Sequence, residues 1–61
     1  MAKPRNYRAF ILDKDNRIVK RHDFEANDGT SALEFARQYV NGHDVEVWRH
    51  MQIIGRLEHE K

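Results

Sequence analysis

Asp28-Gly-Thr-Ser-Ala-Leu-Glu-Phe-Ala-Arg-Gln-Tyr-Val-Asn-Gly42 is the stretch of this chain that has helical periodicity. At about 100° per residue, its apolar side chains fall within roughly 160° of arc, and polar side chains fill the rest of the circumference. The apolar set is Ala32, Leu33, Phe35, Ala36, Tyr39 and Val40. We therefore predict one amphipathic helix, which has a single apolar face to bury.

Both ends of this helix have recognisable capping residues. Asp28 is a good N-cap, and Ser31 followed by Glu34 spells a capping box, so we expect the helix to start between Asp28 and Ser31. Gly42 suits the left-handed position that follows a last helical turn. These signals favour a helix that is complete within this stretch.

Two strand-like runs precede the helix. Tyr7–Leu12 is apolar on both faces, which predicts a central strand. Asp13–Arg17 is a turn, because Asp and Asn side chains hydrogen-bond nearby backbone groups. Ile18–Glu25 is dense in charge and has few apolar residues, which suits an edge strand that must resist pairing with foreign strands.

Two further strand-like runs follow the helix. Asp44–Arg49 alternates between the two faces, with Val45 and Val47 on one of them. Ile53–Glu58 returns as the fourth strand. The connection near His50–Gln52 has no glycine, so the sequence leaves the register of this second hairpin open.

The order of elements is therefore β-β-α-β-β, which predicts an α+β fold. A right-handed crossover through the helix leaves room for the first strand between the second and the third. This gives a four-stranded antiparallel sheet in the order 2-1-3-4, with one helix on one face. The 61 residues form a single small domain, in which residues 1–5 and 59–61 are expected to be loosely ordered.

One helix covers one face of the sheet, so the other face is a candidate partner surface. It would carry Trp48 and one side of the first strand, either Phe10 with Leu12 or else Tyr7 with Ile11. The simplest partner is a second copy of the chain, which gives a homodimer. The predicted interface residues are Phe10, Leu12, Trp48 and Ile54.

Length and composition limit what else the chain can be. A chain of 61 residues buries about 60% of its unfolded surface, so we expect a free energy of unfolding of roughly 3 to 9 kcal/mol. It has no cysteine, so neither a disulfide nor a thiolate metal site compensates for a small core. No apolar run approaches about 18 residues, and the first residues lack the apolar stretch of a secretory signal, so we expect a cytoplasmic protein.

Nucleic-acid binding is the alternative function. The formal net charge is only +1, but residues 1–22 carry an excess of positive charge and residues 23–61 an excess of negative charge. In this alternative the basic first hairpin would contact nucleic acid, and aromatic side chains would stack on bases. The contact residues would be Arg8, Arg17, Lys20 and Arg21. Nearby acidic residues and the low net charge count against this alternative.

Catalytic and metal-binding residue types do not form a recognised pattern. The four histidines have no helical i, i+4 spacing and no accompanying thiolate. Asp13-Lys14-Asp15-Asn16 begins like a calcium loop, but Arg17 and Ile18 stand where an oxygen ligand and a glycine are required. Ser31 and His43 lie at opposite ends of a helix about 15 Å long. We expect no enzyme activity, no metal and no cofactor, and favour a structural or protein-interaction role.

Several segments resemble a group of small uncharacterised proteins of about this length that are abundant in alphaproteobacteria, including rhizobia. The resembling segments are Tyr7-Arg8-Ala9-Phe10-Ile11-Leu12-Asp13, Ile18-Val19, Asp28, Gly42-His43-Asp44-Val45-Glu46-Val47-Trp48 and Arg56-Leu57-Glu58. The chain departs from the group's usual second turn, which contains glycine, by having His50-Met51-Gln52. The resemblance implies a compact domain, and it implies no activity, cofactor or site.

Overall fold

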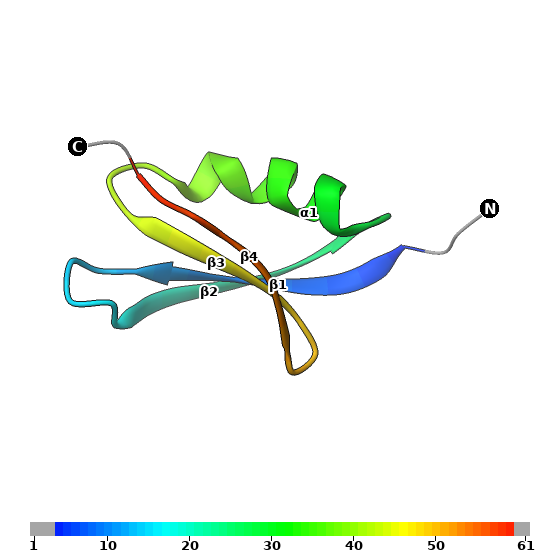
Figure 1. Cartoon of the computed structure of the whole chain (residues 1–61), viewed down its shortest axis with the longest axis horizontal. Helices are drawn as coiled ribbons and strands as arrows, with labels where there is room; N and C mark the ends of the chain where they lie inside the picture. Colours follow the sequence, from blue (N-terminus) through cyan, green and yellow to red (C-terminus); the bar gives the residue numbers. More distant parts are fainter. Residues whose placement is uncertain (1–3, 60–61) are drawn as a thin grey trace.

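Four strands and one helix follow one another within residues 4–59, and Figure 1 shows the helix lying along one side of the strands. The computed structural model describes residues 4–59. The elements are β1 (Arg5–Leu12), β2 (Ile18–Ala26), α1 (Gly29–Ala36), a 3-10 turn η1 (Arg37–Tyr39), β3 (Asp44–Arg49) and β4 (Gln52–Leu57). The sheet order is β2-β1-β3-β4 and every neighbouring pair is antiparallel, which confirms the predicted fold.

Asp28 is the N-cap of α1. Its side chain accepts a hydrogen bond from the Ser31 backbone N–H at 2.8 Å, which places Ser31 inside the helix rather than at its cap. This hydrogen bond lowers the pKa of the Asp28 carboxyl, because it stabilises the charged form. Regular α-helix ends at Ala36 and the chain tightens into η1, so α1 is shorter than the periodic stretch. Gly42 has a φ of 79°, the left-handed conformation predicted for it.

The core lies between α1 and the sheet. Its buried members alternate along β1 and β3, and on α1 they are alanines, which let the helix approach the sheet closely. They are Tyr7, Ala9, Ile11, Ala32, Ala36, Val45 and Val47. The largest side chains that are completely buried are only valines, Val45 and Val47. Such a thin core is typical of a short chain with low stability.

Aromatic side chains fill the space between α1 and the edge strand β2. Phe24 stacks on Phe35 with ring centroids 4.6 Å apart, and His22 stacks on Tyr39 at 4.3 Å with the ring planes 7° apart. Tyr7 extends this cluster from β1, with its ring 6.0 Å from that of Phe24. Phe35 is 42% exposed, so it packs beside the edge strand rather than in the core.

A bulge in β4 decides which of two isoleucines faces the helix. The register shifts between Val47 and Trp48, and because Trp48 is paired with Ile53, Ile54 is an extra residue in β4. Ile54 packs against the helix-side core, and its Cγ2 lies 3.2 Å from the position that a Cβ on Gly29 would take. The prediction that Ile54 belongs to the open face is therefore wrong, and Ile53 takes that place.

Both hairpin turns use left-handed residues other than glycine. His50 has a φ of 55°, a conformation in which histidine is found more often than most residues, and this explains how the second hairpin turns without glycine. Asn16 has a φ of 63° in the first hairpin. There the Asp13 carboxylate accepts hydrogen bonds from the backbone N–H groups of Asp15 and Arg17, as expected for an Asp-rich turn.

The ends that were expected to be loosely ordered are partly tied to the domain. Arg5 is paired with Ala26 at the start of β1, and the backbone N–H of His59 donates to the Asp44 carboxylate at 3.0 Å. Residues 1–3 and 60–61 lie outside the described residues. Within residues 4–59, α1 is too short to cross a bilayer, and no other helix there has the length and apolarity that a membrane span requires.

Candidate interaction surface

The face of the sheet opposite α1, called the open face here, has an aromatic pair at its centre. Tyr7, Ala9 and Ile11 of β1 are buried on the helix side, so Phe10 projects from the open face. Trp48 projects from the same face on β3, and the two rings meet edge to face with centroids 6.4 Å apart. Both side chains are half-buried, and among residues 4–59 no second layer covers them.

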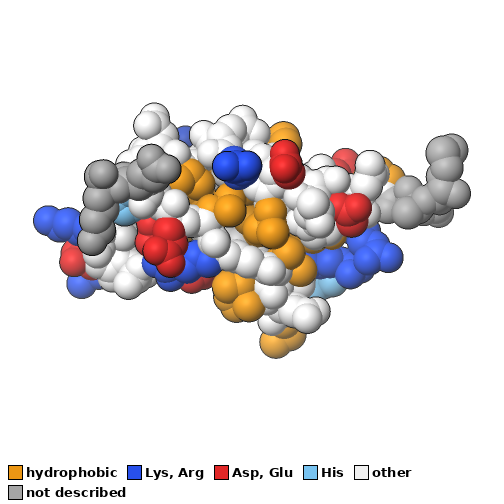
Figure 2. All heavy atoms as spheres, turned by 45° about the horizontal axis from the view of Figure 1, so that its top comes forward, with side chains coloured by type: hydrophobic (Ala, Val, Ile, Leu, Met, Phe, Trp, Pro, Cys, Tyr) orange, Lys and Arg blue, Asp and Glu red, His pale blue; other side chains and the backbone are white. Residues whose placement is uncertain are grey.

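The Trp48 indole already has its hydrogen-bond partner within the chain. Its Nε1–H donates to Glu46 Oε1 at 3.2 Å, so the exposed part of the ring offers only apolar contact to a neighbour. Ile53, which is 46% exposed, is paired with Trp48, and Met51 at the hairpin tip is 94% exposed. Seen from the side of α1, hydrophobic side chains also reach the surface from beneath the helix down to the β3–β4 turn, with most charged side chains towards the two ends (Figure 2).

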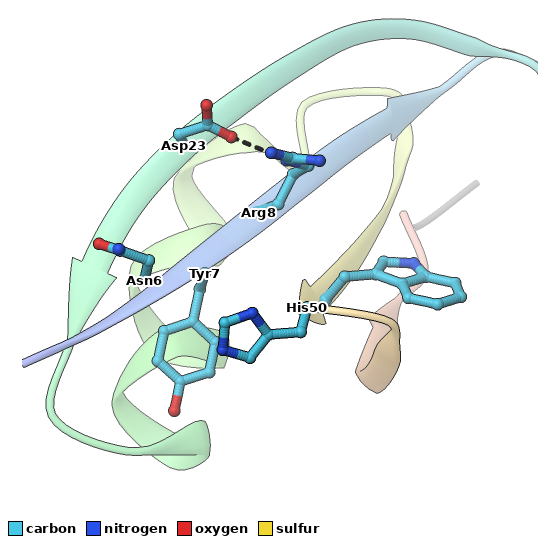
Figure 3. Close-up of a pocket in the computed structure, with 6 residues that line it drawn as sticks. Asn6, Tyr7, Arg8, Asp23 and His50 are labelled. Atoms are coloured by element: carbon cyan, nitrogen blue, oxygen red, sulfur yellow. Dashed lines mark hydrogen bonds and ion pairs between the residues drawn. The ribbon is translucent and has the colours of Figure 1, made fainter.

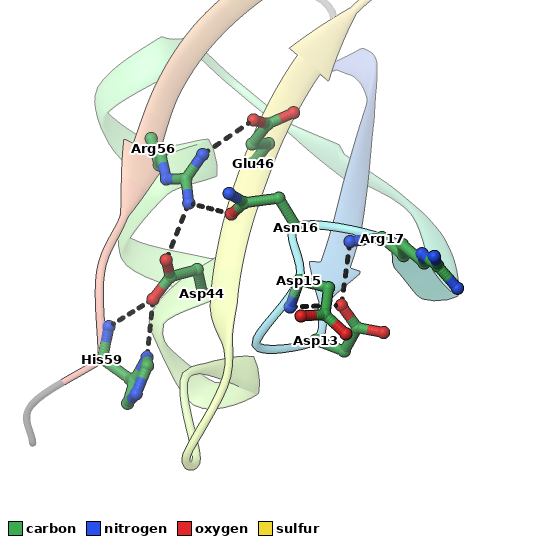
Figure 4. A network of polar contacts seen from close by, with 8 residues as sticks. All are labelled: Asp13, Asp15, Asn16, Arg17, Asp44, Glu46, Arg56 and His59. Carbon is green, nitrogen blue, oxygen red and sulfur yellow. Dashed lines mark hydrogen bonds and ion pairs between the residues drawn. The ribbon is translucent and has the colours of Figure 1, made fainter.

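A polar network centred on Arg56 crosses one end of the open face (Figure 4). Arg56 Nη2 donates to Asp44 Oδ2 at 2.7 Å and to Asn16 Oδ1 at 2.8 Å, and its Nη1 donates to Glu46 Oε2 at 3.3 Å. Asp44 Oδ1 lies 2.6 Å from His59 Nδ1. The Arg56 network is defined as Asn16, Asp44, Glu46, Arg56 and His59. It joins the first hairpin turn, β3, β4 and His59, which lies two residues beyond β4.

The charges of this network stabilise one another. Hydrogen bonds from Arg56, and then from His59, hold the pKa of the Asp44 carboxyl well below its usual range. The hydrogen bond to Asp44 raises the pKa of the Arg56 guanidinium. Asp44 is therefore ionised at neutral pH, and the network joins the first turn, β3 and β4 at this end of the sheet.

Leu12 is buried on the open face although no helix covers it. Its exposed fraction is 3%, and it is paired with Asp44 at the end of β1 where the Arg56 network crosses from β4 to the first turn. Because Arg56 reaches from β4 to the turn that follows β1, we infer that its side chain covers Leu12. Leu12 was predicted as an interface residue, and this prediction is wrong because its side chain is not accessible to a partner.

The network was not predicted from the sequence. Its longest-range link in the sequence joins Arg56 to Asn16, which are 40 positions apart. The available signal was the alternation that puts Asp44 and Glu46 on one face of β3, opposite an arginine in β4. The contact of Arg56 with Asp44 and Glu46 can be inferred only after the β3–β4 register is known.

The four basic residues predicted to contact nucleic acid do not form one patch. Arg8 Nε donates to Asp23 Oδ1 at 2.9 Å, and Arg21 Nε lies 4.0 Å from the same oxygen, so both open-face arginines are directed to one carboxylate. Lys20 is paired with Ile11, whose side chain is in the core, so Lys20 lies on the helix side. Arg17 belongs to the first turn. This arrangement gives no continuous basic track for a phosphate backbone.

A hollow of about 450 Å³ adjoins the aromatic pair at the other end of the open face. Figure 3 shows Arg8 directed to Asp23 above it and His50 beside Tyr7. The lining residues are Asn6, Tyr7, Arg8, Asp23, Trp48 and His50. The hollow places Trp48 at the border between an apolar centre and a polar rim.

Groups suited to catalysis or metal binding do not converge in the described part of the chain. Asp44 and His59 are in contact, but the hydroxyls of Thr30 and Ser31 lie in the first turn of α1, at the opposite end from the loop that leads to Asp44. No cluster of three or more His, Asp or Glu side chains with the geometry of a metal site occurs within residues 4–59. The geometry offers a contact surface more clearly than a reaction centre.

Comparisons with protein-family models, with curated proteins and with solved structures found no match to this chain. The resemblance to small alphaproteobacterial proteins therefore stays a prediction.

Proposed function

We propose that this protein is a small non-enzymatic interaction module that forms a homodimer through its open face. The observation that carries the proposal is the aromatic pair of Phe10 and Trp48, which lies on the two central strands and has no covering layer among residues 4–59. Aromatic anchors at the centre of a patch are typical of the residues that dominate binding energy in protein interfaces.

The surroundings of the aromatic pair suit an interface. The ion pair of Arg8 with Asp23 lies on one side of it and the Arg56 network on the other, so a polar rim surrounds an apolar centre. Because these charges already have partners within the chain, a contact over the centre leaves Arg8, Asp23 and the charges of the Arg56 network paired. A second copy supplies the same apolar centre and the same rim, which is the requirement for a two-fold interface.

The thin core gives a physical reason for association. A domain of 61 residues with valines as its largest completely buried side chains has little stability of its own. Covering Phe10, Trp48 and Ile53 with their counterparts removes further apolar surface from water at about 25 cal/mol per Å². Dimerisation is a common means by which small domains obtain burial that one chain cannot provide.

Sedimentation equilibrium across a concentration series tests the proposal. We expect the wild-type mass to be at least twice 7.3 kDa, and Trp48→Glu to halve it, because the charge would be desolvated at the centre of the interface. Ile53→Lys places a charge beside Trp48 without touching the core, so it provides a second variant if Trp48→Glu fails to fold. Met51→Glu at the hairpin tip is the matched control and should keep the wild-type mass.

Fluorescence provides an independent measurement, since Trp48 is the only tryptophan. Dilution of the wild-type protein should move its emission to longer wavelength over the concentration range in which the mass falls. A wild-type protein that stays at 7.3 kDa up to about millimolar concentration contradicts the proposal. Equal masses for wild type, Trp48→Glu and Ile53→Lys contradict it as well.

A further inference from the structure

A second surface for self-association runs along the edge strand β2. We infer that β2 pairs antiparallel with β2 of a second copy, with His22 of one copy opposite His22 of the other. This inference goes beyond the open-face dimer and does not depend on it, because it uses a different surface and a different symmetry axis.

The free edge of β2 is long and regular. β2 spans nine residues and is paired with β1 on one side only, so its other side presents unpaired backbone N–H and C=O groups. Pairing with β1 is regular from Lys20 to Ala26, and the register shift falls before Lys20. The other edge strand, β4, spans six residues and is interrupted by its bulge. His22 is the middle residue of β2.

Symmetry restricts the possible registers. A two-fold axis perpendicular to the sheet places the helix sides of both copies on one side of the joined sheet and their open faces on the other. Directly opposite residues must therefore come from the same face. With His22 on the axis, Arg21 of each copy lies opposite Asp23 of the other. Moving the axis to either neighbouring residue places Arg21 opposite Arg21 or Asp23 opposite Asp23. Placing the axis on Asp23 also puts Arg21 opposite Glu25, but of these three registers only the one centred on His22 brings opposite charges together without facing like charges.

The charges on β2 therefore favour pairing with a second copy of β2 over pairing with a foreign strand. Charged residues on an edge strand discourage pairing with foreign strands. Around His22 the same charges are complementary to their own copy, and each cross-strand pair of opposite charge is favourable. The side chains have room to make these contacts, since those of Arg21 and Asp23 are 57% and 59% exposed. Asp23 uses Oδ1 for Arg8, and its Oδ2 forms no hydrogen bond with a described residue.

On the helix side, the two copies would meet at His22. Each His22 ring is held flat against Tyr39, 4.3 Å away, so the two imidazoles approach between two tyrosine rings. Lys20 of each copy would lie opposite Phe24 of the other, where its ammonium group can contact an aromatic face. If the open face also pairs, the two axes together give four chains in two eight-stranded sheets.

Cysteine cross-linking tests the register directly, because the chain contains no cysteine. In His22→Cys the two sulfhydryl-bearing residues face each other with Cβ atoms about 5 Å apart, close to the span of a disulfide. Glu25→Cys is the control on the same strand. Residue 25 is exposed, but in this register its counterpart lies six residues away, about 20 Å along the strand. We expect oxidised dimer from His22→Cys and monomer from Glu25→Cys under the same mild oxidant.

Both cysteine variants are made in the Trp48→Glu background, so that contact through the open face cannot contribute to cross-linking. Cross-linking of His22→Cys no faster than that of Glu25→Cys overturns the inference. A failure of the open-face proposal can be distinguished from a failure of the β2 pairing. Cross-linking at position 22, with equal masses for wild type and Trp48→Glu, supports the edge alone.

Charge exchange provides a second test that leaves the His22–Tyr39 contact intact. Arg21→Asp alone and Asp23→Arg alone each place like charges opposite each other, whereas a mixture of the two variants restores two pairs of opposite charge. We expect each variant alone to lose edge pairing and the mixture to regain it in sedimentation. Each variant alone at the same total concentration is the control, because neither can form two pairs of opposite charge with itself. An Arg21→Asp/Asp23→Arg mixture no heavier than either variant alone contradicts the inference.

Discussion

Replacing Leu12 by alanine tests whether Leu12 is buried within one chain or lies at an interface between two chains. Leu12 is 3% exposed beneath the Arg56 network, so Leu12→Ala should leave a cavity and lower the free energy of unfolding. Core Leu→Ala substitutions cost about 2 to 5 kcal/mol. Because this site lies at the end of the sheet, where the Arg56 side chain can relax into the space, we expect about 2 to 3 kcal/mol. That is a large share of the roughly 3 to 9 kcal/mol expected for the whole chain.

Urea unfolding followed by circular dichroism, at one fixed protein concentration, measures this loss. For a slope of about 1 kcal/mol per molar urea, the midpoint should fall by about 2 to 3 M. Ile18→Ala is the matched control, since Ile18 is paired with Leu12 but is 57% exposed, and it should cost less than about 1 kcal/mol. A similar small cost for both variants would refute the burial of Leu12. If the Arg56 network covers Leu12, the effects of Leu12→Ala and Arg56→Met should be less than additive.

Two further predictions concern the turn after the helix and the response to acid. Gly42 is left-handed with open space around its Cα, so Gly42→Ala should cost about 1 kcal/mol by thermal unfolding and Gly42→Asn clearly less; equal effects would contradict the backbone explanation. The pKa of Asp44 is lower in the folded chain than its ordinary value, so its contribution to stability is present above about pH 4 and is lost as the pH falls further. Asp44→Asn should therefore be less stable than wild type at pH 7, and the difference should narrow as the pH falls below about 4, whereas Asp15→Asn in the first turn should match wild type at pH 7; a difference between Asp44→Asn and wild type that persists unchanged in acid would contradict this sign.

The strand order follows from local patterns. Tyr7–Leu12 is apolar on both faces and Ile18–Glu25 is charged, so their central and edge positions can be inferred before any tertiary contact is known. The right-handed crossover then admits one arrangement of four strands. The N-cap at Asp28 and the left-handed Gly42 are equally local, because each depends on hydrogen bonding or backbone freedom within one turn.

The composition of the open face was predicted only in part. Phe10 and Trp48 alternate with core residues in β1 and β3, but alternation alone left open whether Phe10 or Tyr7 faces away from the helix, and the burial of Tyr7 decides it. Ile54 was misplaced because a bulge adds one residue to β4, and a shift of one residue moves a side chain to the other face. That bulge accompanies a turn in which His50 is left-handed, a conformation that the sequence does not specify.

The sequence by itself determined the elements and their order in the sheet, because those depend on periodicity and on nearest neighbours along the chain, but it left open whether Phe10 or Tyr7 lies on the open face. Only the tertiary structure decided that Leu12 is covered and that Arg8 and Arg21 are directed to Asp23. These outcomes depend on contacts between residues far apart in the sequence, such as Arg56 with Asn16. Such contacts exist only after the strands are paired in register, since that pairing sets which long side chains can reach one another.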